Sequence, residues 1–218
     1  MALCRAAAAA GTTTIVATPH VLRDGWANEL PLVRDGLIAR LNDLLGGTPA
    51  VLPGCEYYFA DDALEVLERG ADGPLTPLNR GRYLLVEFPP GFVHPGAEGI
   101  LHEMVVAGTI PVIAHPERNL VLARDPERMS RLLATGALAQ VTAGSLAGDF
   151  GRAARRTAWG MLEEGLVALV ASDAHGLKTR GPRMLEARRL VAAELGEAEA
   201  ARLFDVNPER VLKSEELG

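Results

Sequence analysis

Six short apolar runs, each ending in polar side chains, constrain the fold of this chain more than any other feature. The clearest is TIPVIAHPERN at 109–119, where β-branched residues give way to a histidine, a glutamate and an arginine. Continuous runs of this kind are typical of strands buried on both faces of a parallel sheet. The others are TTTIVATPH at 12–20, AVLPGCE at 50–56, YLLVEFP at 83–89, LAQVTAGS at 138–145 and LVALVASDAH at 166–175.

Stretches with helical periodicity separate these runs, so strand and helix alternate along the chain. This order predicts an α/β fold with a parallel sheet, in which the carboxyl ends of all strands lie on one side and form the ligand site. The polar side chains that end the six runs should therefore meet at one rim. The expected helices are 1–10, 28–44 (amphipathic), 60–69, 94–107, 125–135, 150–164, 182–195, 197–204 and 209–213.

Length, charge and cysteine content narrow the possible classes of protein. A chain of 218 residues with 48% hydrophobic content can bury a full core, so we expect a single domain over 1–218. A net charge of −6 argues against a nucleic-acid partner and fits a site that collects metal cations. The two cysteines, Cys4 and Cys55, have no CxxC spacing, which indicates neither a disulfide framework nor a zinc knuckle and favours a cytoplasmic location.

The alanine-rich opening at 1–11 predicts a helix that Gly11 ends, at the position that glycine favours. It is too short to span a bilayer and lacks the basic start of a secretory signal, so no membrane insertion is expected. No strand precedes this helix in the sequence, and residues 1–3 offer no side-chain oxygen to cap its first amides. We therefore expect the chain to begin inside a structural unit.

His20, Glu56, Glu87 and His115 are candidate metal ligands at the ends of four runs. A lone histidine at a strand end is more often a hydrogen-bonded structural group, and this alternative applies to His20. Glu87 is a stronger candidate because it interrupts LLVEFPP, where a buried carboxylate is costly unless it is paired or bound to a metal. A cation would keep such a carboxylate ionised.

Asp173 and His175, in the sequence SDAH, form the most specific local pattern. On a strand, side chains two residues apart point to the same face, so this carboxylate and imidazole should converge on a cation or a pair of cations. Alternatively, Asp173 caps the following turn and His175 is an ordinary loop residue. Imidazole and carboxylate ligands without a thiolate suit manganese, iron or zinc.

Arg118 and Arg180 are candidates for binding an anion. Arg118 follows His115 by three residues, and Arg180 lies in the turn-rich segment HGLKTRGP. A guanidinium beside a metal cluster favours bidentate binding of phosphate. A surface salt bridge is at least as consistent with the position of Arg180.

Taken together, the motifs resemble the CpsB/CapC-type bacterial tyrosine-protein phosphatases of the polymerase-and-histidinol-phosphatase (PHP) superfamily. The resemblance runs over almost the whole chain and implies a distorted seven-strand α/β barrel with a manganese-type site of two or three ions, iron or zinc being possible. It also implies hydrolysis of phosphotyrosine on a bacterial tyrosine kinase that controls capsule or exopolysaccharide synthesis. The matching segments are ATPH at 17–20, GCEYYF at 54–59, LLVEFP at 84–89, IAHPERN at 113–119, QVTAGSLAGDFG at 140–151, ASDAH at 171–175, RGP at 180–182 and NP at 207–208.

Carried over position by position, this resemblance assigns a role to eight residues. Its phosphate-binding arginines would be Arg118 and Arg180, and clustered metal ions would activate a water for attack on phosphorus. No cysteine nucleophile is implied, because neither cysteine is followed by five residues and an arginine. The implied metal ligands are His20, Glu56, Glu87, His115, Asp173 and His175.

The chain also departs from the family pattern. The Asp-x-His-x-His motif and the LPGxDDG loop that open family members do not occur in the 218 residues, and Val21 stands where many members have a second histidine. We therefore expect a truncated barrel that lacks its first strand, with exposed sheet edges that reduce stability or promote association. Two alternatives stay open: a catalytically impaired protein that binds phosphotyrosine or a kinase, and a PHP phosphoesterase for another phosphomonoester such as histidinol phosphate.

Overall fold

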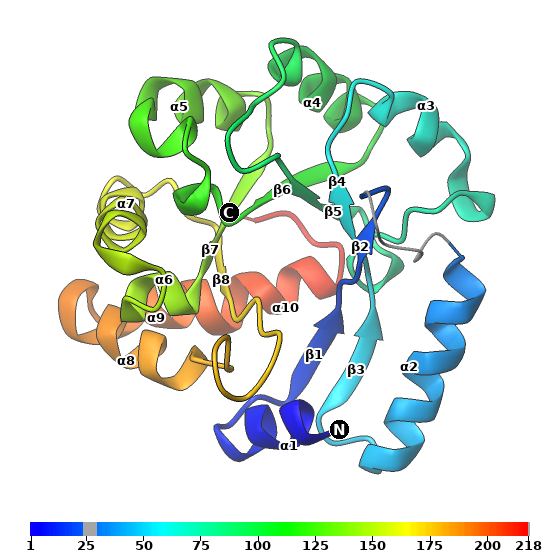
Figure 1. Ribbon diagram of the computed structural model, residues 1–218, viewed down its shortest axis with the longest axis vertical. Helices are drawn as coiled ribbons and strands as arrows, with labels where there is room; N and C mark the ends of the chain where they lie inside the picture. Colours follow the sequence, from blue (N-terminus) through cyan, green and yellow to red (C-terminus); the bar gives the residue numbers. More distant parts are fainter. Residues whose placement is uncertain (24–29, 218) are drawn as a thin grey trace.

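The protein has a mixed α/β fold in which every pair of neighbouring strands is parallel (Figure 1). The structure is a computed structural model that describes residues 1–23 and 30–217. The larger sheet has the order β2 (His20–Val21), β4 (Glu56–Tyr58), β5 (Tyr83–Glu87), β6 (Ile110–Ala114), β7 (Leu138–Thr142) and β8 (Leu169–Ala171). A smaller sheet pairs β1 (Thr14–Ala17) with β3 (Ala50–Pro53).

The six predicted runs form eight strands in the described part of the chain, because the first two runs are each broken in the middle. Pro19 lies at one break and has no amide hydrogen for a sheet ladder. Gly54 lies at the other, where an added Cβ would come within 2.8 Å of Val16 Cγ1. His20 and Glu56 consequently begin short strands instead of ending long ones, and they are direct partners in the register.

Helices surround the strands (Figure 1). Their positions confirm the expected alternation, with ends that differ by a few residues; the first two residues of the helix expected at 28–44 lie outside the described residues. The helices are α1 (Ala2–Ala9), α2 (Pro31–Leu45), α3 (Ala63–Glu68), α4 (Ala97–Val106), α5 (Pro126–Ala134), α6 (Ala143–Ala147), α7 (Gly151–Glu163), α8 (Met184–Leu195), α9 (Glu197–Ala201) and α10 (Asn207–Leu212).

Helix α6 was not predicted, and it corrects the expectation that the run at 138–145 is a strand to its end. β7 ends at Thr142, and the next residue already belongs to the helix. Gly148, at φ +97°, ends α6 in the left-handed conformation that glycine adopts without steric cost. A helix of one turn is too short to leave a periodic signal in the sequence.

Helix α2 is not amphipathic in the expected way. Leu32 and Leu37 are 85% and 63% exposed, and the buried residue of this helix is an arginine, Arg34. Its guanidinium donates to the carbonyl of Pro74 (2.6 Å) and to Thr76 Oγ1 (2.7 Å). Polar contacts of Arg34 therefore contribute to the attachment of α2, and two of the expected apolar positions, Ile38 and Leu41, are only half-buried.

The central strands are buried on both faces, as their continuous apolar sequences predicted. All five residues of β5 are buried, and alternate side chains enter two separate hydrophobic clusters. Leu84 and Val86 belong to the larger cluster, whereas Tyr83 and Leu85 belong to a smaller one that Val211 of α10 also joins. Across residues 1–23 and 30–217, no helix has the length and apolar character to cross a membrane.

Candidate metal and phosphate site

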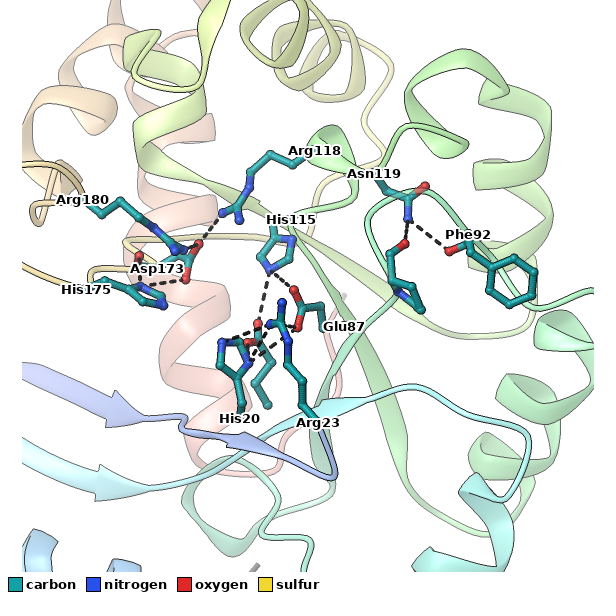
Figure 2. Close-up of polar contacts among 12 residues, drawn as sticks. His20, Arg23, Glu87, Phe92, His115, Arg118, Asn119, Asp173, His175 and Arg180 are labelled. Carbon is teal, nitrogen blue, oxygen red and sulfur yellow. Dashed lines mark hydrogen bonds and ion pairs between the residues drawn. The ribbon is translucent and has the colours of Figure 1, made fainter. Parts of the chain in front are cut away.

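His20, Glu56 and Glu87 meet at one place on the larger sheet, from strands β2, β4 and β5 (Figure 2). Each offers one ligand atom, and these three atoms all lie within 4.8 Å of one another. His20 Nδ1 is 2.7 Å from Glu56 Oε2 and 3.5 Å from Glu87 Oε2. Both carboxylates are buried, so the group has the composition and spacing to hold a cation.

His115 joins this group directly after β6. Its Nε2 lies 3.3 Å from Glu56 Oε1 and 3.7 Å from Glu87 Oε1. Its backbone is in the left-handed region at φ +35°, a conformation that costs about 1–2 kcal/mol outside glycine. The amide of His115 donates to the carbonyl of Gln140 on β7 (2.8 Å), which helps to hold this strained turn and points the imidazole at the carboxylates.

The contacts in this group shift pKa values in different directions. Burial alone would raise the pKa of Glu56, but hydrogen bonds from His115 and His20 outweigh it and lower the pKa to about 2. Burial, and then repulsion from Glu56, raises the pKa of Glu87. Burial disfavours the imidazolium of His115, yet its hydrogen bond to Glu56 raises its pKa overall. A nearby positive charge therefore stabilises the ionised form of the two buried carboxylates, Glu56 and Glu87.

Arg23 is a member of the site that sequence reasoning missed. Its Nη1 donates to Glu87 Oε2 (2.7 Å) and lies 3.2 Å from His20 Nε2. The guanidinium also lies over the ring of Tyr58, 5.1 Å from its centroid. Arg23 thus supplies positive charge to Glu87 (Figure 2). Its position three residues after His20 was the one available signal, and it is weak because the arginine lies outside any periodic element.

Asp173 binds both candidate phosphate arginines. Arg118 and Arg180 each donate to its Oδ2, so the two guanidinium groups meet although they are far apart in sequence (Figure 2). Asp173 and His175 were expected to lie on a strand and to point to the same face. This expectation is wrong, because β8 ends at Ala171 and Asp173 has φ +45°.

His175 lies in the loop after β8, with its side chain 43% exposed. Its Nδ1 is 2.9 Å from the carbonyl oxygen of Asp173, and its ring centroid is 6.3 Å from that of His20. Within the described residues, the tight ligand group contains neither Asp173 nor His175. The eight candidates therefore lie in one region, in two adjoining groups. The first group is His20, Glu56, Glu87 and His115. The second group is Asp173, His175, Arg118 and Arg180.

Phe150, just before α7, is the second residue that sequence reasoning missed. Its ring lies 4.4 Å from the guanidinium carbon of Arg118 and 5.8 Å from that of Arg180. Cation–π contacts of this kind contribute about 0.5–1 kcal/mol each and restrict the orientation of the guanidinium. The sequence did contain a hint, since Phe150 lies within the motif QVTAGSLAGDFG.

A cavity of about 220 Å³ opens beside the site. Glu87, His115 and Arg118 line it together with apolar side chains that include Phe88 and Leu122. It therefore combines a charged side with an apolar one. A larger hollow of about 530 Å³ over α8 contains none of the eight candidate residues.

Cys55 precedes Glu56 but is unsuited to act as a nucleophile. It is fully buried, and its Sγ accepts a hydrogen bond from the amide of Thr76 (3.1 Å). Burial raises the pKa of the thiol to about 11, so it remains protonated at neutral pH.

The sequence matches the family described as "Capsular polysaccharide synthesis, CpsB/CapC" over residues 1–213. The chain is 37% identical to tyrosine-protein phosphatase YwqE of Bacillus subtilis (strain 168) over 216 residues, which cover 98% of this chain and 83% of that protein. It is 33% identical to putative tyrosine-protein phosphatase CapC of Staphylococcus aureus, over 84% of this chain and 71% of that protein.

A solved structure has the same fold. It is described as "Crystal structures of YwqE from Bacillus subtilis and CpsB from Streptococcus pneumoniae, unique metal-dependent tyrosine phosphatases". The match has a TM-score of 0.92 at 35% sequence identity and covers 100% of this chain and 87% of that one.

Proposed function

We propose that this chain, which belongs to the CpsB/CapC capsular polysaccharide synthesis family, is a metal-dependent tyrosine-protein phosphatase. The observation that carries the proposal is the buried group of His20, Glu56 and Glu87 next to two arginines that converge on Asp173. A cation site beside a pair of guanidinium groups supports metal-dependent hydrolysis of a phosphate ester.

In this proposal six residues hold manganese, as two or three ions, with iron and zinc as alternatives. The donor set fits such ions because it combines imidazole and carboxylate groups, two of them buried glutamates that need positive charge. When bound, these ions lower the pKa of a water molecule and neutralise phosphoryl oxygens. The proposed ligands are His20, Glu56, Glu87, His115, Asp173 and His175.

Arg118 and Arg180 bind the phosphoryl group of the substrate. Both guanidinium groups donate to the single oxygen Asp173 Oδ2. A phosphoryl group carries several acceptor oxygens, so it can bind both arginines at once. Phe150 restricts both guanidinium planes, so the arginines are oriented before the substrate arrives. They stabilise the negative charge that builds up on the phosphoryl oxygens during transfer.

The proposed substrate is a phosphotyrosine segment of a bacterial tyrosine kinase in capsule or exopolysaccharide synthesis, in the cytoplasm. The apolar side of the cavity, with Phe88 and Leu122, suits an aromatic ring whose phosphate reaches Arg118. A phenol has a pKa of about 10, so a tyrosine oxygen leaves more readily than an alkoxide and needs less help from an acid.

The finer fold assignment belongs to the same proposal. We infer a single domain of the PHP type, a distorted seven-strand barrel whose first strand is not among the 218 residues. The parallel strand order and the two hydrophobic clusters on opposite faces of β5 support it.

Hydrolysis of a phosphotyrosyl peptide by the manganese-loaded chain tests the proposed function. We expect phosphate release that EDTA abolishes and Arg118→Ala reduces at least about a hundredfold, because a charge-stabilising group is lost. Arg69→Ala, which removes an exposed arginine on the surface, is the matched control and should leave the rate unchanged. Tight binding of the peptide without turnover would favour the impaired binding protein, and faster hydrolysis of histidinol phosphate would favour the other phosphoesterase.

A further inference from the structure

Glu117 lies in the middle of the HPERN motif but has no role in the chemistry described above. It is 1% exposed, so an ionisable side chain lies in the interior of the protein. The segment VTAGS at 141–145 is equally buried: Thr142 and Ser145 are both 0% exposed. Two sequence motifs thus place polar groups in the core, where a polar group without a hydrogen-bond partner lowers stability.

Glu117 binds one side chain and one backbone amide of this segment. Ser145 Oγ donates to Glu117 Oε1 (2.6 Å), and the backbone amide of Thr142 donates to the same oxygen (3.1 Å). Thr142 ends β7, and Ser145 lies in α6. One carboxylate oxygen therefore connects the turn after β6 to the junction between β7 and α6.

Glu117 is flanked by residues of the proposed site on both sides. It lies in a 3₁₀ turn, Pro116–Arg118. Two backbone hydrogen bonds close this turn: the amide of Arg118 donates to the carbonyl of His115 (3.0 Å), and the amide of Asn119 donates to the carbonyl of Pro116 (3.0 Å). A 3₁₀ turn has three residues per turn, so neighbouring side chains point about 120° apart. Fixing Glu117 toward the core therefore fixes the directions of its neighbours.

The end of the same turn is attached elsewhere. Asn119 Nδ2 donates to the carbonyl of Pro89 (2.8 Å), and its Oδ1 accepts from the amide of Val121 (2.9 Å), as Figure 2 shows in part. Asn119 joins the turn to the loop after β5, whereas Glu117 joins it to α6. Glu117 is therefore the attachment of this turn to the junction between β7 and α6, whereas Arg118 is attached to Asp173 and Phe150.

We propose that Glu117 is a positioning residue that holds the HPERN turn on Ser145 and the Thr142 amide, so that His115 faces the carboxylates and Arg118 faces the phosphate. Its part in turnover rests on the proposed phosphatase function; its part in fixing the turn does not.

Bulk alone does not account for a glutamate at this place. Within the described residues, Glu117 Oε2 is a buried oxygen that has no hydrogen-bond partner. An unpaired buried oxygen lowers stability, and a leucine of similar volume would avoid that loss. What the glutamate supplies in exchange is the pair of hydrogen bonds at Oε1, which set the direction of the turn.

The test compares Glu117→Gln, which keeps an acceptor oxygen, with Glu117→Leu, which keeps the volume but removes the acceptor. In Glu117→Leu we expect the amides of Arg118 and Asn119 to exchange with deuterium at least about tenfold faster, because local opening of the turn becomes easier. Hydrolysis of a phosphotyrosyl peptide should lose at least about tenfold in kcat, with a smaller change in KM. Glu117→Gln should stay within about threefold of wild type in both measurements.

Ser145→Ala removes one of the two hydrogen bonds and little volume, so it serves if Glu117→Leu fails to fold. It should show an intermediate effect on exchange and on kcat. Ser130→Ala is the matched control, because it removes an exposed hydroxyl from α5 and should change neither quantity. Unchanged exchange at Arg118 and Asn119 in Ser145→Ala and in folded Glu117→Leu would overturn the proposal. Inactivity of the wild type would instead refute the phosphatase function and leave the exchange result to decide this inference.

Discussion

His20 Nδ1 lies 2.7 Å from Glu56 Oε2, and the two residues are register partners at the start of neighbouring parallel strands. This contact exists because both preceding strands are interrupted, at Pro19 and at Gly54, so that two new strands begin side by side. The amide of Glu56 donates to the carbonyl of Pro19 (3.0 Å) and carries the pairing across the gap. The interruption of the sheet thereby places an imidazole against a carboxylate inside the protein.

Glu87→Gln should weaken manganese binding at least about tenfold, because the substitution removes one of two buried carboxylates while keeping the shape of the side chain. Isothermal titration of the metal-free chain with manganese measures the affinity. Glu65→Gln is the control, since that glutamate is 73% exposed on α3 and contributes no ligand. Equal manganese affinity in wild type and Glu87→Gln would mean that the metal binds elsewhere.

Arg23→Ala should strengthen manganese binding by about five- to tenfold. The guanidinium of Arg23 and a metal ion compete for the same lone pairs of Glu87, and removing one nearby positive charge is worth about 1 kcal/mol at the water-exposed edge of a site. The same titration, with Arg69→Ala as the control for loss of an arginine, measures the effect. Weaker binding in Arg23→Ala would show that this arginine helps to assemble the ligands instead of competing with the metal.

Phe150→Leu should raise KM for a phosphotyrosyl peptide by about two- to fivefold, with unchanged metal content. The substitution removes the cation–π contacts that orient Arg118 and Arg180, which are worth about 0.5–1 kcal/mol, but leaves the metal ligands alone. Steady-state kinetics and elemental analysis of the same preparation provide the two readouts. A loss of bound manganese in Phe150→Leu would contradict the assignment of the ring to the phosphate side of the site.

Cys55 should make stability depend on pH in the alkaline range. Its pKa is about 11 in the folded protein and about 9 in the unfolded chain, so the folded state binds the proton more tightly. The stabilisation is fully present below pH 9 and is lost as pH rises toward 11, by about 2–3 kcal/mol in total. Denaturant unfolding of wild type and Cys55→Ala at pH 8 and pH 10.5 measures it. An identical pH dependence in the two proteins would refute this origin.

Much of the fold could be predicted because buried parallel strands leave continuous apolar runs. His20, Glu56, Glu87 and His115 were placed together from their positions in those runs alone, and they do meet. Arg23 and α6 left no comparable pattern. The arginine reaches Glu87 through a long side chain in a loop, and the helix is a single turn.

Backbone conformation explains the error at Asp173. Asp173 was expected on a strand, but a positive φ at this residue turns the chain away from the sheet and toward two arginines. Positive φ outside glycine is set by tertiary contacts, so the identity of an aspartate does not reveal it. The sequence allowed Arg118 and Arg180 to be proposed as phosphate ligands, but it did not predict that both would donate to Asp173.

The manganese content of the purified chain tests the central claim most directly. After manganese loading and removal of free metal, elemental analysis should find two or three equivalents per chain, and His115→Ala should lose part of this metal because its imidazole touches both carboxylates. His102→Ala, which removes an exposed histidine on α4, should bind as the wild type does. At most one weakly held equivalent in the wild type, unaffected by His115→Ala, would contradict the claim that these residues form a metal-dependent phosphatase site.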